Sequence, residues 1–403
     1  MSISSAITKG VTTYEAWRAF KGVTLLTPTD GTGAALIDLQ GRVVHYWETD
    51  LEPAAGAELL QNGNLLYAGK LQEGPESSLE GASGVILELD WSGKAAWEYR
   101  DRSLHHGFHR MENGNTLVLK RVKVPGTLAE LVAGGIEGPE DDNGEMYGDV
   151  IQEIDPAGKV QWEWIAHKHL DPAVDTVCPI CSRNTWVHIN AAVALSDGSI
   201  LANFMKTNTL AIIDKQSKEI TWRWGQNELA HQHSPTELDN GNILVFDNGF
   251  HMRGFNFGYS RVVEVDRRSG QMVWVYTGGG GGMLHFLYSA AMSNAQRLPN
   301  GNTLICESTT GRLLEVTDKG HLVWEFLNDL PVRYTLPQQA RSSMVYAAYR
   351  YGVDYPGLPG HPSAFLSKQK APGTGELSRA AASPDETDLQ GETIRSRLEA
   401  LGY

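Results

Sequence analysis

Short apolar runs alternate along the chain with turn signals, and this pattern predicts a series of β-hairpins. Two apolar runs flank an Asn-Gly or Asp-Gly pair at five places, beginning with residues 57–67. The turn glycines are Gly63, Gly114, Gly198, Gly241 and Gly301. Asn-Gly between apolar runs is a strong hairpin signal, because a type I′ turn needs positive φ at both central residues. We therefore expect five hairpins with type I′ turns.

A second hairpin, usually turning at Asp-x-x-Gly, follows each of these and carries aromatic residues at fixed positions. Four residues past its turn stand His45, Trp97, Trp162, Trp222, Trp274 and Trp324. Two residues further on stand Trp47, Tyr99, Trp164, Trp224, Tyr276 and Phe326. Residues two apart share one face of a strand. These two aromatic columns are expected to pack between neighbouring repeat units.

The first aromatic column repeats at steps of 52, 65, 60, 52 and 50 residues. Units of about 40 to 50 residues with four strands each are typical of propeller blades. The sequence therefore predicts an all-β fold, a single six-bladed β-propeller with four-stranded blades. The first unit lacks its opening strands, and residues 343–349 are expected to supply a strand that closes the ring.

The predicted propeller divides the chain into three regions. Residues 1–22 form an N-terminal lead-in, residues 23–350 form the propeller, and residues 351–403 form a Pro/Gly-rich arm with a short terminal helix at 393–401. The insertions at 126–148 and 167–185 are expected to be loops over one face of the disc.

The composition and charge of the chain exclude some classes of binding partner. The formal net charge of −14 argues against nucleic acid and anionic membrane surfaces as partners. The sequence contains no run of 18 apolar residues, so no membrane-spanning helix is predicted. The first residues lack a signal-peptide pattern, so the expected location is cytoplasmic, with the three cysteines reduced. Whether copies associate into a homo-oligomer stays open.

The strand before each Asn-Gly turn opens its unit and is expected to line the central channel. Eight residues before the turn glycine stand Ala55, His106, Asn190, His233 and Ser293. Ten residues before it, on the same face, stand Pro53, Leu104, His188, His231 and Ala291. Histidines from consecutive blades thus converge on one level of the channel. Imidazole can act as a nucleophile, as a general acid or base, or as a metal ligand.

Several phrases resemble the arylsulfotransferase family of bacterial propeller enzymes. They are residues 36–45, Trp186-Val-His-Ile-Asn190, Phe246-Asp-Asn-Gly249, Tyr259-Ser-Arg-Val-Val-Glu264 and residues 295–305. The resemblance runs from about Thr24 to Phe326. It implies transfer of a sulfuryl group between phenols through a histidine intermediate, with further histidines and an arginine at the channel mouth. No cofactor is needed for such a transfer.

The resemblance and the strand register together nominate the site residues. The catalytic candidates are His106, His188, His233, Arg253 and His285. The substrate-binding candidates are Asn190, Asn248, Tyr259, Arg261 and Ser293. The family pattern implies a nucleophilic histidine late in the ring, where residues 287–293 hold none. The nucleophile is then His285, the nearest histidine, or one of His188 and His233. The expected partner is a small aromatic or anionic molecule.

Two other functions stay open at this point. One is a metal-dependent propeller lyase or oxygenase with His106, His188 and His233 as ligands of a divalent metal. The other is a non-catalytic propeller that serves as a binding scaffold. Metal analysis of the pure protein separates the first of these from the second.

A separate cluster of metal-ligand residue types lies in the second insertion. His167 and His169 precede Cys178-Pro-Ile-Cys181. Two histidines and two cysteines can bind zinc tetrahedrally, although their spacing does not match a standard zinc finger. The alternatives are free thiols or one local disulfide in a surface loop.

Overall fold

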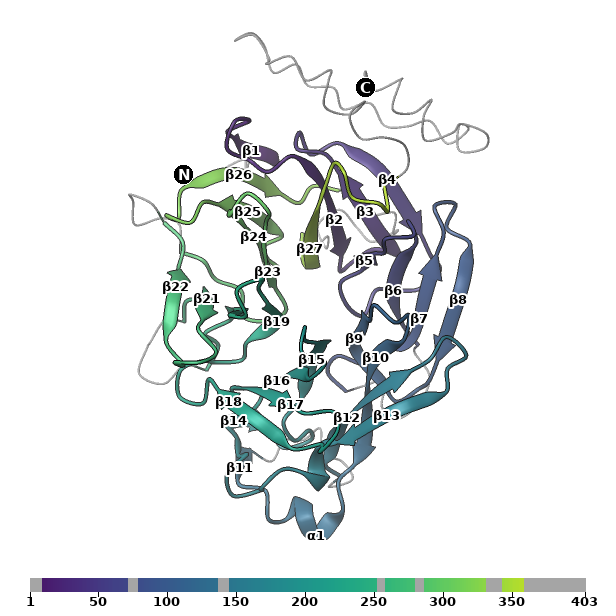
Figure 1. The fold of residues 1–403 in the computed structure, drawn as a ribbon, viewed down its shortest axis with the longest axis vertical. Coiled ribbons are helices and arrows are strands. Elements are labelled where there is room, and N and C mark those ends of the chain that lie inside the picture. Colours follow the sequence, from purple (N-terminus) through teal and green to yellow (C-terminus); the bar gives the residue numbers. More distant parts are fainter. Residues whose placement is uncertain are drawn as a thin grey trace, which may run out of the picture.

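The fold is a ring of six antiparallel sheets, each a blade of a β-propeller (Figure 1). The computed structural model describes residues 9–71, 79–136, 145–251, 258–279, 286–330 and 343–358. The predicted six-bladed, four-stranded architecture is confirmed. The expected C-terminal arm lies mostly outside the described residues, and the helix expected at 393–401 lies wholly outside them.

Each blade runs from an inner strand at the channel to an outer strand at the rim. Blade 1 consists of β27 (Val345–Gly352), β2 (Gly22–Pro28), β3 (Gly33–Ile37) and β4 (Val43–Glu48). Blade 2 consists of β5 (Glu58–Leu59), β6 (Leu65–Lys70), β7 (Gly84–Leu89) and β8 (Ala95–Arg100). Blade 3 consists of β9 (Leu104–Arg110), β10 (Thr116–Lys123), β12 (Tyr147–Ile154) and β13 (Val160–Ile165).

The second half of the ring follows the same plan. Blade 4 consists of β15 (Ile189–Ala194), β16 (Ile200–Phe204), β17 (Thr209–Ile213) and β18 (Ile220–Trp224). Blade 5 consists of β19 (His233–Glu237), β20 (Ile243–Asp247), β21 (Arg261–Val265) and β22 (Met272–Tyr276). Blade 6 consists of β23 (Asn294–Arg297), β24 (Thr303–Glu307), β25 (Arg312–Val316), β26 (Leu322–Leu327) and β1 (Gly10–Tyr14).

Two strands from opposite ends of the chain close the ring. β27 pairs antiparallel with β2 and supplies the inner strand of blade 1, as the sequence predicts. β1 pairs with β26 as a fifth, outermost strand of blade 6, so part of the expected lead-in belongs to a blade. A buried ion pair links the two blades, with 3.0 Å between Arg350 Nη1 and Glu315 Oε2.

The Asn-Gly turns differ from the predicted type I′ geometry. At the blade 5 turn only Gly241 has positive φ, at 80°, and Asn240 does not. The amide of Gly241 donates to the Leu238 carbonyl at 2.7 Å. This is a three-residue loop in which a type I turn is followed by a left-handed glycine. The asparagines also have a role that the prediction did not include. The side-chain amides of Asn240 and Asn242 both donate to the Glu264 carboxylate on the next strand.

The aromatic columns lie on the outer strands and join neighbouring blades. The indole N–H of a tryptophan donates to a backbone carbonyl in the outer hairpin turn of the next blade. The pairs are Trp47 to Asp90, Trp97 to Pro156, Trp162 to Lys215, Trp164 to Lys218, Trp224 to Gly270, Trp274 to Asp318 and Trp324 to Leu39. The last pair links blade 6 back to blade 1.

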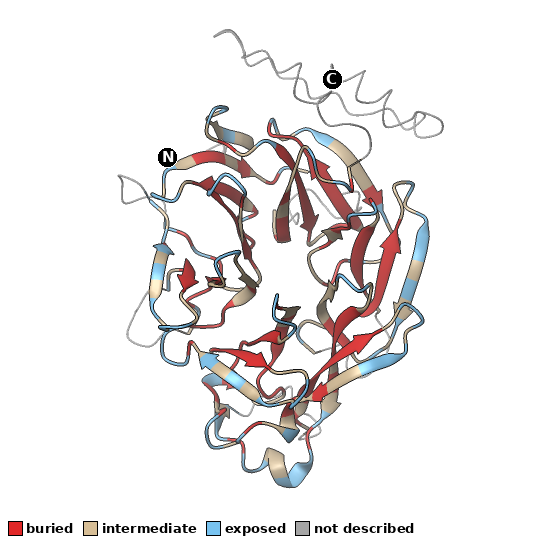
Figure 2. Cartoon of the chain, in the orientation of Figure 1, coloured by how far each residue is buried: buried red, intermediate tan, exposed pale blue. Residues whose placement is uncertain are grey.

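Burial follows the position of a strand in its blade. The middle strands, such as β20 and β24, are buried along their whole length, whereas the outer strands alternate with exposed residues (Figure 2). Middle strands are covered on both faces because blades pack face to face around the ring. Among the described residues, no helix has the length and apolar character needed to cross a membrane.

The two insertions expected as loops contain short elements of secondary structure and meet beside blades 3 and 4. They contain α1 (Gly126–Ala129), β11 (Gly134–Ile136), the 3-10 turn η2 (Ala166–Lys168) and β14 (Val177–Ser182). β11 and β14 form a small parallel sheet. Val132, Val177 and Cys181 are buried in one apolar cluster with residues of blades 3 and 4. The insertions are therefore packed structure that fixes where Cys178 and Cys181 lie.

Candidate functional site

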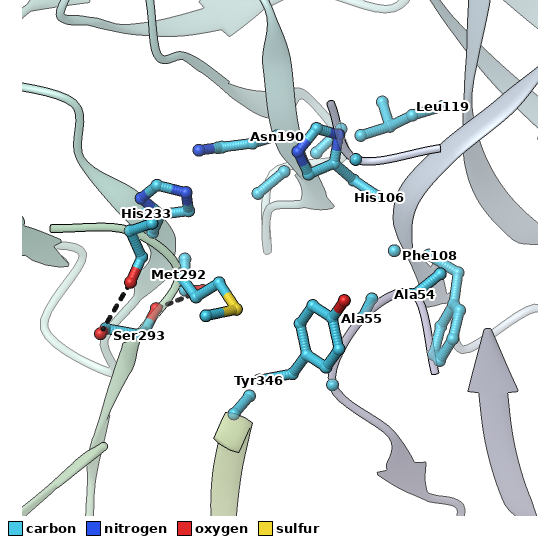
Figure 3. A pocket seen from close by; sticks show the side chains of 18 of the residues that line it. Ala54, Ala55, His106, Phe108, Leu119, Asn190, His233, Met292, Ser293 and Tyr346 are labelled. Atoms are coloured by element: carbon cyan, nitrogen blue, oxygen red, sulfur yellow. Dashed lines mark hydrogen bonds between the residues drawn. The ribbon is translucent and has the colours of Figure 1, made fainter. Parts of the chain in front are cut away.

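A cavity of about 500 Å³ lies where the inner strands meet, and every blade contributes to its lining (Figure 3). His106, Asn190, His233 and Ser293 line it, in agreement with the predicted register. Figure 3 shows His233, Asn190 and His106 along one wall, with Tyr346 across from them. Register on the inner strands thus brings one polar group from each of four consecutive blades to one space.

His106 is the partly buried end, at the cavity, of a row of polar side chains. Its Nδ1 lies 2.8 Å from Nδ1 of His105, and Nε2 of His105 lies 3.3 Å from Oδ1 of Asp149. The His105 and Asp149 side chains are fully buried. The His106 ring also packs against the loop at Gly81, where a Cβ atom would lie 2.1 Å from the ring. The chain leaves Nε2 of His106 on the far side of the ring from His105.

Burial sets the protonation states of His105, His106 and Asp149. Burial lowers the pKa of both His105 and His106 well below the ordinary value, and the nearby Arg121 guanidinium adds to the effect. Burial raises the pKa of Asp149 to about 7. The two imidazoles are therefore neutral at neutral pH, and the pKa of Asp149 lies close to it. Nε2 of His105 and Oδ1 of Asp149 lie in contact without the geometry of a hydrogen bond, so a proton can pass between them only after the two groups reorient.

His188 stands behind His106 and does not line the cavity. The two rings meet edge to face with centroids 4.8 Å apart, and Nδ1 of His188 lies 3.3 Å from the Thr185 hydroxyl. Val187 and His188 both have left-handed backbone, with φ of 61° and 52°. His188 thus does not take the channel position that the register predicts.

His233 is held in one tautomer by its neighbours. Its Nδ1 lies 2.7 Å from Oδ1 of Asn248 and 2.9 Å from the carbonyl of His231. The amide group of Asn248 donates to the carbonyls of Ser289 and Met292, which identifies Oδ1 as the atom that faces His233. Two acceptors at Nδ1 require that Nδ1 carries the proton. Nε2 of His233 is then left with its lone pair.

The other nominated residues take different places. Asn190 lines the cavity, and its amide donates to the Gln232 carbonyl at 3.0 Å. Ser293 lines it too, with its hydroxyl engaged to Ser289 at 2.9 Å. Asn248 supports His233 from behind and does not line the cavity.

Arg261 and Tyr259 do not line the cavity, contrary to expectation. The Arg261 guanidinium pairs with the buried carboxylate of Asp247 at 2.8 Å, and Asp247 also accepts from the Ala230 amide at 2.8 Å. Arg261 therefore fixes the loop that precedes β19. The carbonyl of Tyr259 approaches Gly249 so closely that a Cβ there would lie 1.9 Å away. Arg253 and His285 lie outside the described residues.

The sequence analysis did not nominate several cavity residues, among them Tyr346, Lys70 and Glu80. Tyr346 lies on β27, whose role as an inner strand was predicted, so alternation along that strand could have found it. Lys70 lies at the end of β6, with its Nζ 6.0 Å from the centre of the Tyr346 ring. Glu80 comes from the loop before β7. No sequence signal marks Lys70 or Glu80.

A second cluster of chemically active side chains lies outside the cavity lining. Cys178, Cys181, His231 and His251 each offer one ligand atom, and these atoms all lie within 4.8 Å of one another. The histidines expected beside the cysteines are elsewhere. His169 stacks on Trp164 with ring centroids 5.2 Å apart, and His167 is not part of the cluster. The long-range partners of the cysteines could not be read from local spacing.

The three buried histidines predict acid sensitivity. Burial lowers the pKa of His105, His106 and His188 well below the unfolded value of about 6.5. Below that pH the unfolded chain binds protons that the folded chain does not, so stability falls as pH falls. Each such histidine costs about 1.4 kcal/mol at about pH 5.5. Burial raises the pKa of Asp149 and Glu58 to about 7, and these carboxyl groups take up protons in the folded state over the same range and oppose this loss. The contribution of one histidine is therefore measured as the difference between the wild type and a variant that lacks it.

The variant His188→Gln isolates one of these contributions. It removes one titrating group, so between about pH 7.5 and about pH 5.5 its melting temperature should fall less, or rise more, than that of the wild type. Melting curves of both proteins in matched buffers test this. An identical pH slope in the two proteins would show that His188 takes up its proton in the folded state.

The fold and the cavity define a class, a six-bladed propeller whose central cavity is lined by a histidine from blade 3, an asparagine from blade 4 and a histidine from blade 5. The model of the family described as arylsulfotransferase (ASST) matches residues 18–231, more than half of the chain. The chain belongs to the arylsulfotransferase family. A second model, described as outer membrane protein assembly factor BamB, matches residues 148–328. A search of curated proteins finds no match.

The chain is also similar to solved structures. A protein of unknown function from Bacteroides caccae is 14% identical, with a TM-score of 0.53, 82% of this chain and 99% of that chain covered. A streptogramin B lyase is 13% identical, with a TM-score of 0.43, 79% of this chain and 82% of that chain covered. The virginiamycin B lyase of Staphylococcus aureus with quinupristin is 13% identical, with a TM-score of 0.40 and coverages of 81% and 85%. At 14% identity, the similarity to the Bacteroides caccae protein shows a shared fold and nothing more.

Proposed function

We propose that this protein is a transferase that moves a sulfuryl group from an aryl sulfate to a phenol, with His233 as the nucleophile. The observation that carries the proposal is the fixed tautomer of His233, since two acceptors at Nδ1 leave a lone pair on Nε2. His233 lines the cavity. Membership of the arylsulfotransferase family supports the same chemistry.

In the first half-reaction Nε2 of His233 attacks the sulfur of the aryl sulfate. An N–S bond forms, the S–O(aryl) bond breaks, and the departing phenolate oxygen takes a proton. In the second half-reaction an acceptor phenol loses its proton, its oxygen attacks the same sulfur, and the N–S bond breaks. The sum exchanges one sulfuryl group for one proton between two phenols, with no cofactor.

His106 is the group proposed to carry that proton. It lines the cavity with His233, and its Nδ1 is linked through His105 to Asp149. Because the pKa of Asp149 is raised to about 7 by burial, the chain can store or release one proton near neutral pH. His106 then acts as acid toward the leaving phenolate and as base toward the incoming phenol.

The cavity suits a molecule with an aromatic ring and an anionic group. Phe108, Leu119, Met292 and Tyr346 offer apolar and aromatic surface. Lys70 and the amide of Asn190 offer donors for sulfate oxygens. These groups support a small aryl sulfate as the substrate class.

The metal-dependent alternative receives less support from the geometry. In the described part of the chain, the cluster of potential metal ligands does not include His106, His188 or His233. The Nδ1 atoms of His106 and His233 are also engaged with other groups. No specific observation favours a lyase or an oxygenase at the cavity.

Incubation of the protein with 4-nitrophenyl sulfate and phenol tests the proposal. We expect 4-nitrophenolate release that depends on phenol, formation of phenyl sulfate, and a protein adduct of one SO₃ group on His233. Peptide mass spectrometry after a rapid quench locates the adduct. Phenyl sulfate formation with the adduct on another residue would overturn the role of His233, and no transfer with any phenol acceptor would overturn the reaction class.

A further inference from the structure

We propose that Cys178, Cys181, His231 and His251 bind one zinc ion at a structural site between the second insertion and blade 5. The ligand atoms come from three segments that are far apart in the sequence. Cys178 and Cys181 lie on β14, His231 precedes β19, and His251 follows β20. The proposal concerns metal binding and does not depend on the reaction at the cavity.

The spacing of the ligand atoms is that of a tetrahedral centre. Sγ of Cys178 lies 3.5 Å from Nδ1 of His251, and Sγ of Cys181 lies 3.4 Å from the same atom. Sγ of Cys181 lies 3.3 Å from Nε2 of His231. Zn–S bonds of about 2.3 Å and Zn–N bonds of about 2.05 Å at tetrahedral angles place sulfur and nitrogen about 3.6 Å apart. The four atoms need to move only slightly to accept the ion.

The chemistry of the ligand set selects the metal. Two thiolates neutralise a divalent cation, and the mixed sulfur and imidazole set favours zinc over magnesium or calcium. Cys178, Cys181 and His231 are buried. Four protein ligands fill the coordination sphere, so the site has no open position and is structural. Both cysteines are free thiols in this arrangement.

The backbone at both histidines takes a conformation that nine other described residues with side chains also show. His231 and His251 have left-handed backbone, with φ of 59° and 67°. Residues with a side chain seldom adopt this conformation, and the cost is accepted where the surrounding structure requires a particular side-chain direction. The two strained positions are those that aim an imidazole at the cysteines. The rings meet with centroids 4.6 Å apart.

The ion would hold the segments that orient His233. The carbonyl of His231 contacts Nδ1 of His233, and Asn248, which contacts the same atom, lies three residues before His251. One ion bound to His231 and His251 therefore restrains both acceptors of His233. This consequence rests on the proposed function, whereas the metal site itself does not.

Zinc analysis of the purified full chain tests the site. We expect about one zinc ion per chain in the wild type. Cys181→Ser and His251→Asn should lose most of it, while His167→Asn, His169→Asn and Cys306→Ser should keep it. The His167 and His169 variants are matched controls because they change the histidines nearest to the cysteines in sequence. Loss of zinc from these controls with retention in His251→Asn would overturn the ligand set.

Cobalt substitution supplies a readout that does not depend on stable variants. Wild-type protein stripped by a chelator and loaded with Co²⁺ should show the visible bands of tetrahedral cobalt and a thiolate-to-cobalt charge-transfer band. A wild type that holds no zinc and shows no cobalt bands would overturn the proposal. A Cys178–Cys181 disulfide in protein purified under reducing conditions would do the same.

The two proposals fail separately. Loss of zinc binding without loss of sulfuryl transfer would leave the reaction standing and remove the link between the ion and His233. A zinc-loaded protein without transferase activity would leave the metal site standing.

Discussion

Replacing His233 by alanine is expected to abolish sulfuryl transfer, with kcat falling by a factor on the order of 10⁴ to 10⁶. The reason is that a covalent route ends when its nucleophile is removed, and no other described imidazole offers the same geometry. His188 lies behind His106 and does not line the cavity, and His106 is tied to His105. Initial rates with 4-nitrophenyl sulfate and phenol measure the effect.

Controls separate this chemical role from a structural one. The His233→Ala protein should keep its zinc content and nearly the melting temperature of the wild type, since the ring faces a cavity. Free imidazole should restore part of the activity by occupying the vacated space. Asn248→Leu keeps the nucleophile but removes one of the two acceptors at Nδ1, leaving the His231 carbonyl, and we expect a loss of about 10- to 100-fold. Wild-type rates in His233→Ala would disprove the assignment.

The fold could be predicted because its signals are local and repeated. The aromatic columns recur on the outer strand of each blade, where tryptophans such as Trp47 and Trp164 donate to the next blade. Because the same hydrogen bond between blades recurs around the ring, aromatic residues recur at regular spacing in the sequence. The turn type was wrong because Asn-Gly was read as a two-residue loop. The carboxylate that binds Asn240 and Asn242 belongs to another strand, and no local pattern reveals it.

The site was predictable only as far as strand alternation holds. His106, Asn190, His233 and Ser293 line the cavity as the register requires. His188 does not line it, and left-handed backbone does not explain the difference, because His106 and Ser293 have φ of 53° and 83° and do line the cavity.

The metal cluster shows a different limit of sequence reasoning. Cys178 and Cys181 lie next to His231 and His251, which are 50 and 70 residues beyond Cys181 in the sequence. Loops from different blades bring them together, and nothing near the cysteines in sequence encodes that contact. Arg261 likewise contacts Asp247 and not the cavity, since the buried carboxylate needs a partner.

Trp324→Ala is expected to lower the free energy of unfolding by about 3 to 5 kcal/mol. Trp324 is fully buried where the ring closes, in one apolar cluster with Leu26, Ile37 and Val345 of blade 1. Its indole N–H donates to the Leu39 carbonyl at 2.8 Å. Truncation leaves a cavity between the first and last blades and removes the partner of that carbonyl. Urea denaturation followed by tryptophan fluorescence and by circular dichroism measures the loss.

Trp274 is the matched control because it occupies the same column position in blade 5. Its indole donates to Asp318 at 2.7 Å, but its side chain is partly exposed. Trp274→Ala should therefore cost clearly less than Trp324→Ala, while Trp324→Phe should retain most of the packing and lose only the hydrogen bond. Equal losses for the two alanine variants would mean that the junction of blades 6 and 1 is no more critical than any other. A larger loss at Trp324 is expected because its side chain is fully buried in the cluster that joins blades 6 and 1, whereas the side chain of Trp274 is partly exposed.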